Sequence, residues 1–341
     1  MDITANIEAF SILGKFLQQF STVSFNENQE LDDLNRNFRD SFNNQIRQSH
    51  IYNPWFTEEF VRYAITSISS SLERKKILKW LEAYPEIKKL NGKNKKIGLI
   101  MAGNIPLVGF HDVLSCVFSG HELLGKLSSK DDKFFPFLKE ILCYLNPEME
   151  EKMNFTDQIL KNIDAIIATG SNNSARYFEY YFSKFPNIIR KNRNSAAIIT
   201  GDETADDLRN LGNDIFLYFG LGCRNVSKLF FPEGYDPSSI ISYFDHYSYL
   251  YNHNKYANNY DYYKAIYLVN MIQHLDSGFL LLKEDFSYSS PAGVLYYEFY
   301  KSLDSLKNKL DKDKNLIQCV VAKKGLLEGT VNFGESQFPE L

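Results

Sequence analysis

The sequence predicts an α/β protein whose sheet is doubly wound, with helices on both faces. Short apolar segments at 96–101, 122–126, 164–169 and 195–200 are each bounded by polar turn residues, as buried parallel strands are. Segments of helical periodicity separate them, and this alternation predicts a parallel sheet covered by helices. The 341 residues exceed what one core usually organises, so we expect two α/β domains.

The N-terminal region predicts helices without strands. Apolar side chains recur at helical spacing between Ile7 and Phe20. Asn53 and Pro54 have the residue types of an N-cap and a first helical position, and a further helix is expected before Pro85. We therefore expect three regions, a helical one at 1–92 and two α/β domains at 93–195 and 196–341.

Charge and composition exclude several classes of protein. The net charge is −4 and no block of sequence is strongly basic, so nucleic acid is not an expected partner. The N-terminus lacks a basic and apolar leader, and no apolar run is long enough to span a bilayer, so we expect a cytoplasmic protein without a membrane segment. The cysteines lack the spacing of a metal site and are expected to be reduced thiols: Cys116, Cys143, Cys223 and Cys319.

Cys223 lies in the segment that carries the most chemical information, residues 219–228. Gly220 and Gly222 precede it and allow a sharp bend. We expect the bend to open a helix, whose dipole would favour the thiolate of Cys223 over the thiol. A free cysteine is more often a buried apolar residue, but this context predicts a nucleophile.

Polar residues follow the predicted strands, at the ends where ligands of open α/β sheets bind. Asn104 follows the first strand, and its amide either caps a turn or donates to an oxyanion. Lys126 ends the second strand and suits a phosphate or a ribose. Thr169, Gly170 and Ser171 end the third, where free amides at a helix N-terminus would suit a phosphate. The sequence contains no glycine-rich dinucleotide fingerprint and no P-loop.

These segments, in this order, resemble the aldehyde dehydrogenase superfamily and, within it, the acyl-CoA reductase branch typified by the LuxC subunit of bacterial fatty acid reductase. The resemblance covers most of the chain. It implies an aldehyde dehydrogenase-like fold with a dinucleotide-binding domain at 93–195 and a catalytic domain at 196–341. It rests on the strand end 102–106, the lysine-serine segment 124–129, the Thr-Gly-Ser turn 168–171 and the cysteine segment 219–228, with weaker matches at 53–57, 290–294 and 332–336.

The resemblance also implies a role for each matching residue. Cys223 would be the nucleophile, and its backbone N–H and the side-chain amide of Asn104 would form the oxyanion hole. The implied cofactor is a nicotinamide dinucleotide, and no metal is implied. The residues implied to bind this cofactor are Gly103, Lys126, Ser128, Ser129, Thr169, Gly170 and Ser171.

Three departures from the family pattern bear on the reaction. Acid-forming members activate water with a glutamate, but the equivalent stretch here, 190–195, contains no carboxylate. The acyl-enzyme is therefore expected to be reduced, or transferred to a thiol, rather than hydrolysed. Ser129 replaces an acidic residue that bonds the ribose, and Lys130 follows it, so NADPH is favoured over NADH. A second ribose-binding glutamate is missing near 289–291.

The expected function is NAD(P)H-dependent reduction of an acyl-CoA to an aldehyde, through an acyl-cysteine and with release of CoA. The protein is expected to be a homo-oligomer and to meet a partner protein that transfers or activates the acyl group. Three alternatives stay open: an acyl phosphate reductase resembling γ-glutamyl phosphate reductase, a cysteine hydrolase that acts on thioesters with Cys223 and His246, and a non-catalytic nucleotide-binding subunit.

Overall fold

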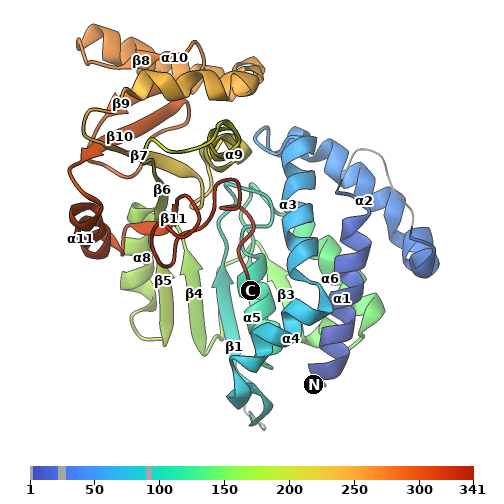
Figure 1. The fold of residues 1–341 in the computed structure, drawn as a ribbon. Helices are drawn as coiled ribbons and strands as arrows, with labels where there is room; N and C mark the ends of the chain where they lie inside the picture. Colours follow the sequence, from blue (N-terminus) through green and yellow to red (C-terminus); the bar gives the residue numbers. More distant parts are fainter. Residues whose placement is uncertain (1–2, 22–27, 90–93) are drawn as a thin grey trace. The chain divides into compact units, whose positions relative to one another are not determined.

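The computed structural model describes residues 3–21, 28–89 and 94–341 and divides the chain into two compact units. The first unit comprises residues 1–192 and 339–341, and the second comprises 193–338. Each unit contains a sheet whose strands are mostly parallel (Figure 1). The α/β class with a helical N-terminal region is therefore confirmed. The region boundary expected between residues 92 and 93 lies outside the described residues.

The N-terminal part of the first unit is helical. Its elements are α1 (Ile3–Gln18), η1 (Gln29–Leu31), α2 (Asp32–Tyr52), α3 (Glu58–Ser71), α4 (Arg74–Glu82) and η2 (Pro85–Lys89), where η is a 3-10 helix. Helix α1 buries Phe10, Leu13 and Phe16 completely, and it packs against α3 and α4 (Figure 1). In the described part of the chain, no helix combines the length and the apolar character that a membrane span requires.

The helix start predicted at Asn53 and Pro54 is wrong. These residues form the turn between α2 and α3, in which Asn53 Oδ1 accepts the Trp55 N–H at 3.1 Å. The N-cap of α3 is Thr57, whose side chain accepts the Phe60 N–H. Asn and Thr are both favourable N-caps, so the local sequence does not distinguish the two positions.

The first unit contains a five-stranded parallel sheet. Its elements are β1 (Lys96–Ile100), α5 (Phe110–Phe118), β2 (Glu122–Lys126), α6 (Phe134–Leu145), α7 (Met149–Lys152), β3 (Met153–Thr156), β4 (Ala165–Thr169), α8 (Asn172–Phe182) and β5 (Asn187–Arg190). The strand order is β3-β2-β1-β4-β5. Because Ile100 pairs with both Lys126 and Ala168, strands β1, β2 and β4 end at the same edge of the sheet.

The helix expected to open at Ser128 and Ser129 begins later, at Phe134. The Asp131 N–H donates to the Ser128 carbonyl at 2.9 Å, so a tight turn follows β2 before α6 starts. Serine is as common in turns as at helix caps, and the sequence pattern alone therefore misplaces this helix start.

The second unit contains a six-stranded sheet. Its elements are β6 (Asn194–Ile198), α9 (Ala205–Phe216), η3 (Leu217–Gly220), β7 (Val226–Pro232), η4 (Pro237–Asn252), α10 (Asn254–Val269), β8 (Leu275–Asp276), β9 (Leu281–Glu284), β10 (Val294–Tyr300), α11 (Leu303–Asp313) and β11 (Ile317–Val321). The strand order is β11-β6-β7-β10-β9-β8, with β8 antiparallel to β9. The apolar run Leu229, Phe230 and Phe231 is fully buried in β7, inside this sheet.

Candidate active site

Cys223 lies in the turn between η3 and β7, directly after the strained backbone of η3. Tyr218, Phe219 and Gly220 all have left-handed backbones, with φ of 54°, 57° and 73°. For the two aromatic residues this conformation costs about 1–2 kcal/mol each. Strand β7 begins at Val226, so Cys223 precedes a strand and the predicted helix start is wrong. No helix dipole therefore acts on this thiol in the predicted way.

Asn225 fixes the turn that carries Cys223. Its Nδ2 donates to the carbonyls of Asp214 and Leu217, at 3.0 and 2.8 Å, and its Oδ1 accepts the Gly222 N–H at 2.8 Å. The last carbonyls of a helix lack hydrogen-bond donors within the helix. The side-chain amide of Asn225 supplies such donors at the end of α9. Sequence reasoning missed this role, because an asparagine two residues after a cysteine carries no signal of its distant partners.

The charges near Cys223 are positive. Burial raises the pKa of the Cys223 thiol above its ordinary value, while Arg224 and Arg193 partly offset this rise. Neither a histidine nor a carboxylate is among the groups that act most strongly on the thiol. His246, the expected partner in a cysteine hydrolase, is exposed on η4. The centroid of its ring lies 4.0 Å from that of the Tyr247 ring.

Ser195 connects the Cys223 turn to the neighbouring strand. The fully buried Ser195 Oγ donates to the Cys223 carbonyl at 3.0 Å and lies 3.0 Å from Cys319 Sγ. It also accepts the Cys319 N–H at 3.2 Å. Residues 193–195 therefore lie beside the candidate nucleophile, with Arg193 as the charged member.

A segment near the C-terminus docks on the same turn. The fully buried Asp214 of α9 accepts the N–H groups of Gly334 and Ser336, at 2.6 and 2.9 Å. The guanidinium of Arg224 donates to the Ser336 carbonyl. Burial raises the pKa of Asp214 to about 6 despite these hydrogen bonds. The weak motif at 332–336 thus belongs to the surroundings of Cys223.

In the first unit, the loops that follow β1 and β2 pack closely together. The Met101 N–H donates to the Lys126 carbonyl at 3.2 Å. A Cβ on Gly103 would lie 2.5 Å from Ser128 Oγ, so a larger residue there would force one of the two loops to shift. The fold therefore brings the predicted site residues Gly103, Asn104 and Ser128 to one edge of the sheet. Asn104 is exposed there, whereas Cys223 belongs to the second unit.

A groove of about 950 Å³ opens at the ends of β2 and β3. Lys126 and Ser129 line it, as the resemblance implies for cofactor-binding residues. The Lys126 ammonium donates to the Gln158 carbonyl at 3.3 Å, and Lys139 pairs with Glu150 at 2.9 Å. The groove is nonetheless acidic, because four carboxylates line it: Asp132, Glu140, Glu150 and Asp157.

The turn of Thr169, Gly170 and Ser171 lies at the end of β4 and is not among the residues that line this groove. The expected free amide of Gly170 is not free, since it donates to the Arg190 carbonyl at 3.3 Å. Ser171 is the N-cap of α8 and accepts the Ser174 N–H. A Cβ on Gly170 would approach Ser174 and the Phe178 ring to 2.9 Å, so this glycine serves the packing of helix against strand.

No metal centre is evident in the described ranges 3–21, 28–89 and 94–341. These residues contain no cluster of three or more histidine, cysteine, aspartate or glutamate side chains with the arrangement of metal ligands.

Solved structures with a similar fold are aldehyde dehydrogenases and related enzymes. An NAD-dependent aldehyde dehydrogenase from Sinorhizobium meliloti has a TM-score of 0.60 and 12% identity, over 96% of this chain and 75% of that one. A mutant aldehyde dehydrogenase from Bacillus cereus has a TM-score of 0.58 and 11% identity, over 98% of this chain and 86% of that one. An E. coli NADP-dependent enzyme has a TM-score of 0.59 and 11% identity, over 98% of this chain and 87% of that one. The fold is therefore that of the aldehyde dehydrogenases.

The family is more specific. The family model of the LuxC acyl-CoA reductases matches residues 8–235, about two thirds of the chain. The chain belongs to the LuxC acyl-CoA reductase family, which confirms the resemblance seen in its motifs. Family and fold together make it an oxidoreductase of the aldehyde and acyl-group class. Comparison with curated protein sequences gives no significant match.

Proposed function

We propose that this protein reduces an acyl-CoA thioester to an aldehyde through an acyl-enzyme at Cys223. The observation that carries the proposal is the turn that holds Cys223, which Asn225 fixes through its hydrogen bond from the Gly222 N–H and in which Arg224 is the neighbouring residue. Burial raises the pKa of the Cys223 thiol, but Arg224 and Arg193 lower it and so partly offset this rise, which favours the thiolate that attacks a thioester. The stretch 190–195, where the resemblance places the water-activating glutamate of acid-forming relatives, contains no carboxylate, so we expect the acyl-enzyme to be reduced rather than hydrolysed.

The proposed role of the chain begins at Cys223. The thiol loses its proton to water and the thiolate attacks the acyl carbonyl, with Arg193 and Arg224 stabilising the negative charge. The resemblance implies that the Cys223 N–H and the Asn104 amide would donate to the developing oxyanion, and such a donor contributes about 3–4 kcal/mol in comparable sites. The C–S bond to CoA then breaks, CoA leaves as a thiolate that takes a proton, and the acyl group stays on Cys223.

A nicotinamide cofactor, when bound, supplies the hydride that reduces the acyl group to the aldehyde and releases the Cys223 thiolate. The groove beside Lys126 and Ser129, with a volume of about 950 Å³, supports a place for such a cofactor in the first unit. Taken without the carboxylates of the groove, Ser129 and Lys130 favour the ribose 2′-phosphate of NADPH over the free hydroxyl of NADH. The four carboxylates of the groove oppose a 2′-phosphate, since they repel phosphate and accept hydrogen bonds from ribose hydroxyls. We therefore propose NADH as the preferred cofactor, with NADPH used less efficiently.

The test is a Cys223→Ala variant, assayed by the loss of nicotinamide absorbance with a series of acyl-CoA chain lengths. We expect reduction to fall by at least about 10³-fold, because the covalent step is lost, with cofactor binding unchanged. Cys143→Ala is the matched control, since Cys143 is half-buried in the first unit, and it should retain full activity. Full activity of Cys223→Ala, or thioester hydrolysis without cofactor oxidation in the wild type, would overturn the proposal.

An acyl phosphate is the second candidate substrate. The arginines beside Cys223 would also suit a phosphate leaving group, since guanidinium pairs with phosphate oxygens. The aromatic content of 15% favours an apolar acyl chain over a charged glutamyl group. Parallel assays with a long-chain acyl-CoA and with an acyl phosphate separate the two, and we expect the acyl-CoA to have the higher kcat/KM.

The assembly of the protein stays a prediction. We expect a homo-oligomer, a cytoplasmic location, and a partner protein that supplies or activates the acyl group. Sedimentation of the purified protein over a range of concentrations tests the first of these, and a single monomeric species throughout would contradict it.

A further inference from the structure

Asp131 makes a buried contact that links the loops after β1 and β2. Its side chain lies in the turn before α6 and is 4% exposed. Oδ2 accepts the backbone N–H of Leu107 at 2.7 Å. Leu107 lies three residues after Asn104, in the loop between β1 and α5. A carboxylate from one loop therefore holds the backbone of the loop that carries the proposed oxyanion donor.

The backbone at Leu107 is strained, and its hydrogen bond to Asp131 stabilises it. Its φ is 56°, in the left-handed region, and its side chain is 2% exposed. A left-handed backbone is strained for a leucine, and a hydrogen bond to a carboxylate is stronger than one to a neutral acceptor. The Leu107 carbonyl in turn accepts the Phe110 N–H at 2.9 Å, at the start of α5. The contact with Asp131 thus offsets the strain of the turn and connects it to the helix.

Residues 104–106 are held between two fixed points. On one side Gly103 is pressed against Ser128, where a Cβ would approach Oγ to 2.5 Å. On the other side Leu107 is bonded to Asp131. Pro106 lies between them and restricts the backbone further. The position of Asn104 at the end of β1 is therefore set by the turn after β2 rather than by β1 alone.

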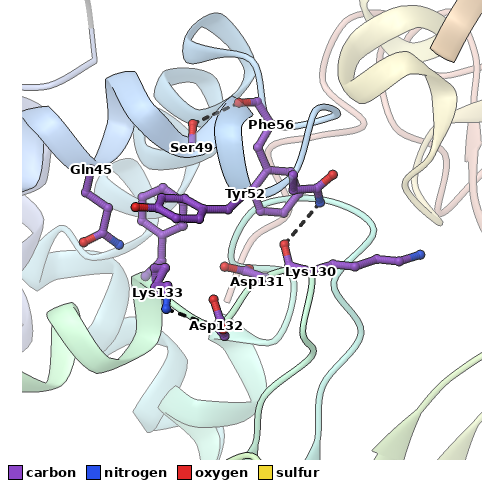
Figure 2. Close-up of a pocket in the computed structure, with 10 residues that line it drawn as sticks. Gln45, Ser49, Tyr52, Phe56, Lys130, Asp131, Asp132 and Lys133 are labelled. Carbon is purple, nitrogen blue, oxygen red and sulfur yellow. Dashed lines mark hydrogen bonds and ion pairs between the residues drawn. The ribbon is translucent and has the colours of Figure 1, made fainter.

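The second oxygen of Asp131 faces a small cavity (Figure 2). Oδ1 has no hydrogen-bond partner among the described residues, and neither has the buried Nε2 of Gln45 on the cavity wall. Burial raises the pKa of Asp131 to about 7, the Leu107 N–H opposes this rise, and Asp132 adds to it. The other charged or titratable groups that line the cavity are Tyr52 from α2, and Lys130 and Lys133 from the same turn as Asp131.

We propose that Asp131 is a positioning residue of this enzyme, which through the Leu107 amide holds residues 104–106 in the conformation that presents the Asn104 amide to the oxyanion. This proposal rests on the proposed function. Asp131 touches no substrate in it and acts through the backbone of the neighbouring loop. Ionised Asp131 holds Leu107 more strongly than the protonated form, because a charged acceptor makes the stronger hydrogen bond.

The test compares Asp131→Ala, Asp131→Asn and a matched control. Asp131→Ala removes the acceptor, and we expect kcat for acyl-CoA reduction to fall by about 10- to 100-fold, less than the loss of an oxyanion donor itself. The KM values and the alkylation rate of Cys223 should not change. Asp131→Asn keeps an oxygen for the Leu107 N–H, so kcat should stay within about threefold of the wild type. In the wild type kcat should fall as pH drops through about 7, and in Asp131→Asn this dependence should be lost.

Asp164→Ala is the control. Asp164 Oδ2 accepts the backbone N–H of Lys96 at 2.7 Å, so the variant removes the same kind of bond at the opposite end of β1. We expect its kcat to equal that of the wild type. Hydrogen exchange at the Leu107 amide gives a second readout that needs no substrate. Exchange should accelerate in Asp131→Ala and stay slow in Asp131→Asn and Asp164→Ala.

Two results would overturn the proposal. One is an Asp131→Ala variant that keeps its kcat and its slow exchange at Leu107. The other is an Asp131→Asn variant that loses as much kcat as Asp131→Ala although its Leu107 amide stays protected. A wild-type protein that reduces no acyl-CoA would overturn the proposed function instead, and the exchange experiment would still decide whether Asp131 holds Leu107.

Discussion

The side-chain amide of Asn225 donates to the carbonyl of Leu217 at 2.8 Å, and this bond joins the end of α9 to the turn that carries Cys223. Asn225 is 1% exposed, so its hydrogen bonds are shielded from bulk solvent. Between the two residues the backbone passes through the left-handed positions Tyr218, Phe219 and Gly220. The placement of the candidate nucleophile therefore depends on a side chain that carries out no chemistry.

The first prediction concerns the hydrogen bonds of the Asn225 side chain. Asn225→Ala leaves buried carbonyls of α9 without a donor, and we expect the free energy of unfolding to fall by about 2–3 kcal/mol. Alkylation of Cys223 by iodoacetamide should also change, because the turn relaxes. Urea unfolding measures the first effect. Asn259→Ala, which removes an exposed hydrogen bond to the Lys255 carbonyl in α10, should change neither property. Equal effects of the two variants would contradict the prediction.

The second prediction concerns pH and Asp214. Its folded-state pKa is raised to about 6, above the ordinary value of 3.8, chiefly by burial. The folded state therefore binds this proton more tightly than the unfolded state does. Its contribution to stability is complete below about pH 4 and is lost as pH rises through about 6. The loss amounts to at most about 3 kcal/mol, from the size of the shift.

The measurement is urea unfolding of the wild type and Asp214→Asn at several pH values between 4 and 7. The unfolding free energy of the wild type minus that of Asp214→Asn should fall as pH rises through this window, because only the wild type titrates at this position. A constant difference for Asp214→Asn across this pH range would show that Asp214 titrates normally.

The third prediction concerns the close contact of Gly103 with Ser128. Gly103→Ala places a Cβ 2.5 Å from Ser128 Oγ, so the loop after β1 must shift. Because this loop carries Asn104, we expect kcat to fall by at least about tenfold, as expected for a displaced oxyanion donor. A second substitution, Ser128→Gly, removes the clashing atoms and should restore part of the activity of Gly103→Ala. Failure of this double variant to recover would count against the steric explanation.

The fourth prediction concerns the acidic groove. Glu140→Gln and Asp157→Asn together remove two of its negative charges. We expect the ratio of kcat/KM for NADPH to that for NADH to rise by roughly three- to tenfold, as for partly screened surface charges. Glu151→Gln changes a neighbouring carboxylate that does not line the groove, and it should leave the ratio unchanged. A ratio unaffected by the double variant would mean that the adenosine end binds elsewhere.

The sequence predicted some of these features and missed others for identifiable reasons. The strand β1 and the end of β2 at Lys126 are predicted by apolar runs that the structure confirms. The edge strands β3 and β5 were missed because they are short and partly exposed, so they carry little apolar signal. The helix predicted at Cys223 is wrong because glycines indicate a bend but do not distinguish a helix from a strand after it.

The amino-acid sequence by itself determined the α/β class, the order of the motifs and the identity of Cys223 as the candidate nucleophile. Periodicity and glycine spacing are local properties, so a single segment contains them in full. Only the tertiary structure decided which residues surround the thiol, that Asn225 and Asp214 fix its turn, and that Asp131 holds the loop of Asn104. These contacts join residues far apart in the chain, and burial, which raises the pKa values of Cys223, Asp214 and Asp131, arises only when the chain packs.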